Sequence, residues 1–487
     1  MSNVFALTDF RAFLVRRFGA VIVTCFIVLC TVGMVYYVYF AAPDSITRDE
    51  WKFMPVLRHW YSGQLTLSDI WDTNSPGSEH RTPAFRLYFI ANAALFGLDV
   101  RLGCYIGVLA LGLLALCLYR HFIRSGTAAP ETFDHLAFIP VALGVFSFAQ
   151  SHFYTYDLLA MFAIVGTFWF VALWTAMDSR LRTPQPWWRY AGLMVSMVLA
   201  LVLFGAGKGP AIVLATLVMI VSLAVQAEGG KGTGFRMLAW MGAALLAAES
   251  IYWYGGAGKM DSGMLGSFIG RISDDPLGAA EYVLHALGAS VVIDVGLQRL
   301  AVGTDTVGLA VLAFSLLALY LYLRMRLYRQ SLVPLTMALF VGGYLGELLI
   351  ARFGRGTENG AAPRYVFTDH LLAVACLFVC AMALRRLHAA GRRRLSAGLL
   401  ALLVLGVASL EGYNLSVDLD GLSAHKRSQD RAVAIAKARL AGASTPYPRW
   451  YCPSPRVCDE GVRFLAAHRL SFFHEPRGKR HPRHRKP

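Results

Sequence analysis

The sequence predicts an all-α, polytopic membrane protein. Of its 487 residues, 56% are hydrophobic and only 16% are charged, whereas a soluble domain carries about a quarter charged residues. Mean hydropathy is +0.50. Apolar runs of about 20 residues, the length of one helical bilayer crossing, recur along most of the chain. A β-barrel would instead show short strands of alternating hydrophobicity.

Eleven apolar runs predict membrane-spanning helices. They lie at about 18–41, 100–122, 134–151, 155–177, 190–207, 210–227, 237–255, 305–324, 332–350, 365–384 and 396–411. No small-residue cleavage site follows the first run, so we interpret it as a retained span and not as a signal peptide. Residues 84–97 are too few for a full crossing and predict a partly immersed helix.

The distribution of basic residues predicts the topology. They precede the first span and then fall in alternate loops, at Arg11, Arg16, Arg17, Arg120, Arg124, Arg180, Arg182, Arg189, Lys231, Arg236, Arg324, Arg326, Arg329, Arg385, Arg386 and Arg392 to Arg394. The positive-inside rule places these residues in the cytoplasm. The first external loop (42–99), the loop 256–304 and the C-terminus then lie outside. In a bacterium this predicts an inner-membrane protein with a periplasmic C-terminus.

The segment after the last span predicts a separate small unit. We expect a transmembrane module over residues 1–411, a small periplasmic tail with helices at 422–440 and 456–469 over residues 412–476, and a disordered basic end at 477–487.

Two cysteines of this tail, Cys452 and Cys458, flank the polar turn CPSPRVC. Their spacing allows a disulfide in an oxidising compartment such as the periplasm. The other six cysteines lie inside apolar runs, where they predict small buried side chains. The net charge of +16 is typical of basic cytoplasmic loops and of contact with anionic lipid. We expect no nucleic-acid partner.

The first external loop is rich in charged and aromatic side chains. Asp49 and Glu50 follow the first span closely, and Trp51 and Trp60 come shortly after them. Such a loop lies at the membrane interface, where tryptophan prefers to sit. It predicts either one wall of an active site or an amphipathic helix that only anchors the first span.

Further ionisable residues map to the same face of the membrane. Asp157 lies at the external mouth of the fourth span, and Lys208 lies between the fifth and sixth. The external loop 351–364 carries Arg355 and Arg364, against the positive-inside rule. Either these arginines bind an anion, or a short re-entrant loop simply tolerates basic residues on this face. Ionisable residues at membrane depth are costly and usually functional. Carboxylates and cations on one face suit transfer chemistry on a lipid phosphate.

The order of these motifs resembles the GT-C superfamily of integral membrane glycosyltransferases, in the branch with bacterial protein mannosyltransferases and lipid A aminoarabinose transferases. The matching segments are Asp49-Glu50, Glu79 to Pro83, Leu95 to Gly97, Tyr156 to Leu159, Lys208 to Pro210 and Arg364-Tyr365. One departure is that His80-Arg81 replaces the lysine of the family's Glu-Lys-Pro-Pro signature. The loop 351–364 and the long tail also depart from the short-tailed transferases.

The resemblance implies an inverting transfer of a sugar from a polyprenyl-phosphate donor to a glycan, lipid or protein acceptor. It implies Asp49 as the general base, with Glu50 and Asp157 orienting the acceptor or a divalent ion. The leaving phosphate would be bound by Lys208, Arg81, Arg364, Tyr365 and Arg355, and an acceptor or metal pocket would contain Glu79 and His80. The resemblance makes no cofactor certain, and it is compatible with a divalent metal ion. No nucleotide-binding motif is found.

Two other functions are compatible with a polytopic membrane protein. A transporter or lipid-linked oligosaccharide flippase would show inverted repeats with broken spans at matching positions, and we find none in the sequence. A non-catalytic subunit of an envelope-assembly complex would tolerate removal of the charges on the outer face.

Overall fold

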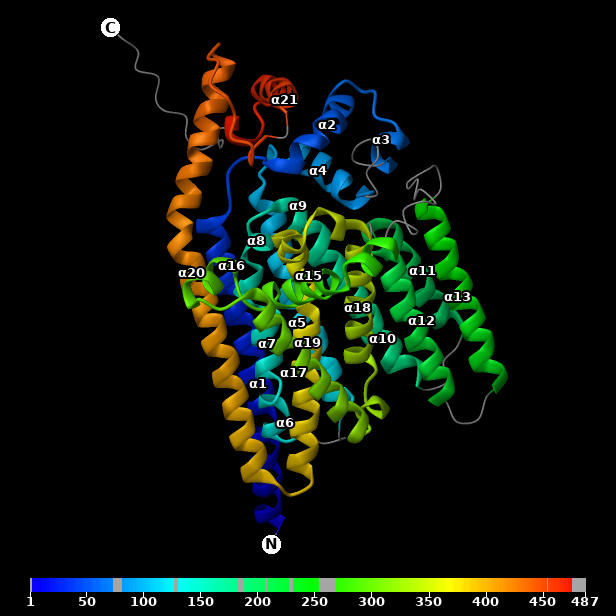
Figure 1. The fold of residues 1–487 in the computed structure, drawn as a ribbon. Coiled ribbons are helices and arrows are strands. Elements are labelled where there is room, and N and C mark those ends of the chain that lie inside the picture. Colours follow the sequence, from blue (N-terminus) through cyan, green and yellow to red (C-terminus); the bar gives the residue numbers. More distant parts are fainter. Residues whose placement is uncertain are drawn as a thin grey trace.

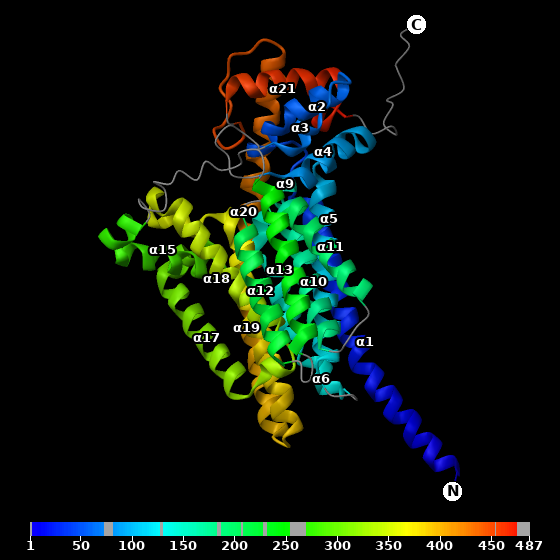
Figure 2. The ribbon, with the colours of Figure 1, turned by 90° about the vertical axis from the view of Figure 1, so that its right-hand side faces the viewer.

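The computed structural model describes residues 2–72, 81–126, 130–182, 187–205, 208–226, 231–253, 269–452 and 454–474. Every regular element within these ranges is a helix. The long helices run side by side in one bundle (Figures 1 and 2), and nine described helices are long and apolar enough to cross a membrane. The predicted class, an all-α polytopic membrane protein, is therefore confirmed.

The bundle contains α1 (Ser2–Ala41), α5 (Arg101–Arg124), α10 (Val165–Leu181), α11 (Trp187–Phe204), α12 (Gly209–Gln226), α13 (Lys231–Trp253), α17 (Thr304–Arg324), α18 (Val333–Arg352), α19 (Pro363–Ala389) and α20 (Arg393–Leu440). The predicted spans 190–207 and 237–255 correspond to α11 and α13, whose described apolar parts are shorter than the nine candidates. The count of eleven spans stays a prediction.

Helix α19 is the central helix of the bundle. Of its apolar window, 83% is buried, compared with 22% for α1 and for α17. The outer helices therefore expose large apolar side chains, such as Leu29 and Leu316. In a membrane this surface faces lipid, where an apolar side chain carries no hydration cost.

The third and fourth predicted spans are interrupted helices. The third consists of α6 (Thr132–Leu136), α7 (Ile139–Val145), η2 (Phe148–Gln150) and α8 (Ser151–Tyr154). The fourth begins with α9 (Asp157–Leu159) and a π-helical turn, η3 (Ala160–Ile164), before α10. The π turn begins three residues after Asp157, and such turns occur frequently at functional sites.

Short helices connect the later spans: α15 (Pro276–Ala289), α16 (Asp294–Leu300), η4 (Leu327–Arg329), η5 (Phe353–Arg355) and η6 (Thr357–Ala361). Helix α15 packs directly on the start of α17. A side chain at Gly288 would overlap the carbonyl of Thr304, and one at Gly308 would overlap that of Leu284. Glycine at both positions allows this close approach of the two backbones.

One end of the bundle carries a second hydrophobic core, which we call the cap. It is formed by η1 (Arg48–Phe53), α2 (Met54–Tyr61), α3 (Leu67–Trp71), α4 (Pro83–Phe96), the last turns of α20, α21 (Pro455–His468) and η7 (Ser471–Phe473). Figure 1 shows α21 beside α2 at this end, opposite the N-terminal end of α1. The loop that follows the first span (42–99) and the C-terminal tail thus share one core.

The predicted domain boundary at 411/412 falls inside α20, which continues without a break to Leu440. Two polar side chains near this boundary contact neighbouring elements of the bundle. Glu411 accepts the Phe148 amide N–H at 2.8 Å, and the Asn414 side chain donates to the Val291 carbonyl at 2.9 Å. The predicted helix at 422–440 is therefore the end of α20. The basic end, 477–487, lies outside the described residues.

Candidate functional site

The Asp49-Glu50 pair begins the cap immediately after α1. Residues 42–47 lead from the end of α1 to η1, and Thr47 adopts the extended conformation of an N-cap residue. The Glu50 carboxylate accepts the Thr47 amide N–H at 2.7 Å. This capping box fixes the turn and directs the Glu50 side chain inward, where it is 1% exposed.

The structure brings this pair against the second acidic segment, Tyr156 to Leu159. The Asp49 amide N–H donates to the Tyr156 hydroxyl at 3.2 Å. The Leu158 amide N–H donates to Glu50 Oε1 at 3.4 Å. Segments more than 100 residues apart in the chain therefore form one site, at the end of the bundle that carries the cap.

The three carboxylates of this site have different environments. The Asp49 side chain is 54% exposed and pairs with Lys52 Nζ at 2.7 Å. Glu50 is enclosed, and burial raises its pKa to about 8, against the opposing effect of the two amide donors from Thr47 and Leu158. Asp157 is 2% exposed. Among the three, only Asp49 is open to a substrate arriving from outside.

Asp157 lies at the floor of the site between α5 and α4. Its carboxylate packs against Gly103, so a side chain at that position would overlap the carboxylate. The Tyr88 hydroxyl lies close to the same position. Burial, and next the charge of Asp157, raise the pKa of Tyr88. Tyr88 therefore keeps its proton and remains a hydrogen-bond donor beside this carboxylate.

Sequence reasoning assigned no role to Arg48, His152 or Tyr156, although Tyr156 begins one of the matching segments. Arg48 has φ +50°, the left-handed conformation that non-glycine residues rarely adopt. Its Nη1 lies 3.3 Å from His152 Nε2. A local signal existed for His152 and Tyr156, because both stand in SHFYTYD, the segment that contributes Asp157. No local signal links Arg48 to the tail.

Lys208 belongs to a different cluster of charges. Its side chain is 8% exposed, and Nζ donates to Thr368 Oγ1 at 2.7 Å. The rings of Phe162 and Tyr344 lie 5.6 Å and 5.2 Å from Nζ. Two acidic side chains, Glu347 on α18 and Asp369 on α19, lie close enough to interact electrostatically with the ammonium. In this conformation the ammonium is enclosed and already hydrogen-bonded.

The other predicted phosphate ligands lie on separate elements. Arg81 is 2% exposed, with its guanidinium 5.0 Å from the Trp71 ring centroid. Arg364 is exposed and lies over the ring of the buried Tyr365, at 5.0 Å. Arg355 is exposed as well, and no contact between described residues joins Arg355 or Arg364 to Asp49.

Glu79 and His80 fall in residues 73–80, outside the described ranges. Over the described residues, no group of three or more histidine, cysteine, aspartate and glutamate side chains is arranged to hold a metal ion. The described carboxylates Asp49, Glu50 and Asp157 therefore do not form a metal centre by themselves.

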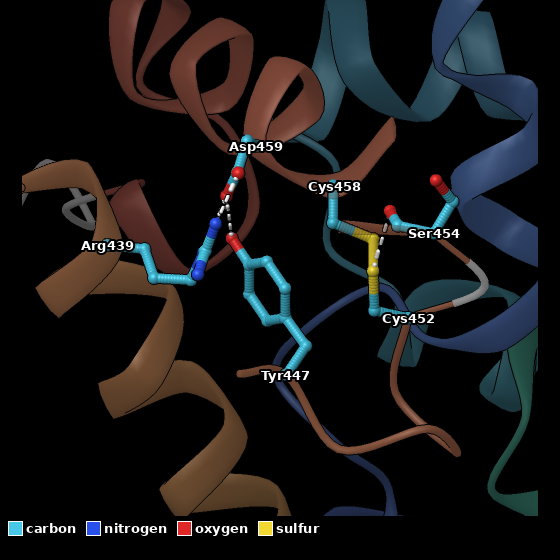
Figure 3. The surroundings of a disulfide bond; sticks show 6 residues. All are labelled: Arg439, Tyr447, Cys452, Ser454, Cys458 and Asp459. Atoms are coloured by element: carbon cyan, nitrogen blue, oxygen red, sulfur yellow. Dashed lines mark hydrogen bonds and ion pairs between the residues drawn. A yellow bond between two sulfur atoms is a disulfide. The ribbon is translucent and has the colours of Figure 1, made fainter. Parts of the chain in front are cut away.

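The tail carries a disulfide between Cys452 and Cys458 (Figure 3). Beside it, Arg439 at the end of α20 donates to both carboxylate oxygens of Asp459 on α21, at 2.8 Å and 2.6 Å, and the Tyr447 hydroxyl donates to Asp459 at 2.9 Å. Arg439 in the first place lowers the pKa of Asp459. These bonds fix α21 against the end of α20 within the cap.

Comparison of the chain with protein-family models, with curated proteins and with solved structures finds no match.

Proposed function

We propose that this chain is an integral membrane glycosyltransferase that uses a polyprenyl-phosphate sugar as donor, with Asp49 as the general base. The observation that carries the proposal is the meeting of the Asp49-Glu50 turn with the Tyr156-Asp157 turn. It leaves one exposed carboxylate, on Asp49, above two buried ones. The site lies where the first span ends, the depth at which a polyprenyl phosphate would present its sugar.

In this mechanism the Asp49 carboxylate accepts the proton of the acceptor hydroxyl. The hydroxyl oxygen forms a bond to the anomeric carbon, and the bond from that carbon to the phosphate oxygen breaks. The polyprenyl phosphate leaves with the electron pair. Attack from the face opposite the leaving group inverts the anomeric configuration. Glu50 holds the turn in place through Thr47 and Leu158.

The test is sugar transfer by purified protein in lipid nanodiscs, with a panel of polyprenyl-phosphate hexoses, N-acetylhexosamines and pentoses. Asp49→Asn keeps the size of the side chain but cannot take the proton, so transfer should fall ~10²–10⁴-fold. Asp430→Asn is the control, because Asp430 is another exposed carboxylate near the cap end of α20. Equal transfer by both variants and the wild type would rule out Asp49 as the base.

One observation favours the second candidate, a transporter or flippase. Lys208, Glu347 and Asp369 lie close together between bundle helices, and ionisable residues within a membrane often mark ion pathways. A flippase would move the lipid across a vesicle membrane whether or not Asp49 is present. Lipid translocation that survives Asp49→Asn, in protein that transfers no sugar to any acceptor, would favour this function. A non-catalytic subunit would show neither activity.

A further inference from the structure

Arg48 has a costly backbone conformation that a contact from the tail holds in place. Its φ of +50° is one that glycine adopts readily and other residues rarely do. The Arg48 amide N–H donates to the Tyr451 carbonyl at 2.9 Å, a contact from the tail. A non-glycine residue persists in such a conformation only when its surroundings fix it, and these residues concentrate at functional sites.

The guanidinium of Arg48 is exposed and, among the described residues, forms no ion pair. Its one hydrogen-bond contact in this part of the chain is His152 Nε2, at 3.3 Å. Two other cap arginines have carboxylate partners: Arg58 pairs with Glu460, and Arg439 with Asp459. The neighbouring carboxylate of Asp49 is taken by Lys52. Arg48, next to the proposed base, thus has an exposed guanidinium without an ion-pair partner among the described residues.

We infer that Arg48 binds the phosphate group of the substrate beside Asp49, and that His152 and the Tyr451 carbonyl position it. The inference rests on the proposed function and adds a residue to it. A guanidinium has five N–H donors, so one can bind His152 while others bind two phosphate oxygens. Because Arg48 and Asp49 are adjacent, the same turn would hold the leaving phosphate and the base that activates the acceptor.

The left-handed backbone makes a sharp test available. Arg48→Gly removes the guanidinium, keeps the N–H that binds Tyr451 and relieves the strain, so thermal stability should stay equal or rise. Affinity for a sugar-free polyprenyl phosphate, measured in phosphatidylcholine nanodiscs, should fall about 10- to 100-fold, as for loss of a charged hydrogen bond. Arg48→Asn, which also tolerates this conformation, should lose as much affinity.

Two other exposed arginines share the left-handed conformation and serve as matched controls. They are Arg326, with φ +51°, and Arg469, with φ +54°. Arg326→Gly and Arg469→Gly make the same change of backbone and charge, and both should bind polyprenyl phosphate like the wild type. Inorganic phosphate and phosphatidylglycerol, tested in parallel, show whether Arg48 takes any phosphate or only the polyprenyl-linked one.

The positioning role of His152 has its own readout. His152→Ala should weaken polyprenyl phosphate binding, and His152→Gln, which keeps an acceptor for the guanidinium, should restore part of it.

Wild-type affinity in both Arg48→Gly and Arg48→Asn would overturn the inference. If Asp49→Asn then still lost sugar transfer, the glycosyltransferase proposal would stand without Arg48. If the wild type bound none of the three phosphates, both would fall.

Discussion

The indole of Trp51 meets the phenol ring of Tyr451 edge-on, with ring centroids 5.6 Å apart. Trp51 lies in the loop that follows the first span and Tyr451 in the tail, and both side chains are fully buried. The contact stands beside the backbone bond from Arg48 to Tyr451. The turn that carries Asp49 is therefore packed against the tail, and the tail is part of the candidate site's support.

This packing predicts that bulk on α21 destabilises the cap. A Cβ at Gly461 would lie 2.7 Å from Trp51 Cζ3, too close for ordinary contact. Because Trp51 is fully buried, we expect Gly461→Val to cost about 1–3 kcal/mol, the range of overpacked cores, and to lower the melting temperature. The control is Gly421→Val on α20, where a Cβ would meet nothing within 4 Å. Equal melting temperatures of the Gly461→Val and Gly421→Val variants would show that α21 does not pack on Trp51 in solution.

The topology predicts that the two ends of the bundle differ in access from outside the cell. Ala467 on α21 and Ala390, directly after α19, are exposed. Figure 1 shows α21 at one end of the bundle and the turn between α19 and α20 at the other. In a background without the six free cysteines, Ala467→Cys should react with an impermeant thiol reagent in intact cells. Ala390→Cys should react only after the cells are opened. The reverse pattern would place the cap in the cytoplasm.

The environment of Glu50 predicts a pH dependence. Its folded pKa of about 8 exceeds the ordinary value of 4.5, chiefly because it is buried, with Asp49 adding to the shift and Arg48 opposing it. Between these values the folded protein keeps a proton that the unfolded chain has lost. Stability should therefore fall as pH rises through this window, by at most about 1.4 kcal/mol per pH unit, and should level off outside it.

Glu50→Gln is the variant that isolates this effect. The amide resembles the protonated acid, so the melting temperature should vary less between pH 5 and pH 8 than in the wild type. For the same reason sugar transfer should suffer less than in Asp49→Asn. A wild-type melting temperature that changes no more across this range than that of Glu50→Gln would mean that Glu50 is already ionised in the fold at pH 5.

The sequence by itself determined the fold class and the position of most spans. A run of about 20 apolar residues can cross a bilayer only as a helix, because no water satisfies its backbone groups there. That constraint is local, so it can be read without knowing the neighbours. The same logic, with alternate loops on alternate faces, predicted that Asp49 and Asp157 share one end of the bundle, and the structure places them together.

Only the tertiary structure decided which charged side chains are open to a substrate and which are buried. Asp49 and Glu50 are adjacent, yet one is exposed and the other buried, because the capping turn at Thr47 points them in different directions. Lys208 is enclosed by partners far away in the chain. The tail's role was also hidden, since Tyr451 lies some 400 residues beyond Trp51. Hydrophobic periodicity reports burial within one element; which distant element does the burying depends on packing across the whole fold.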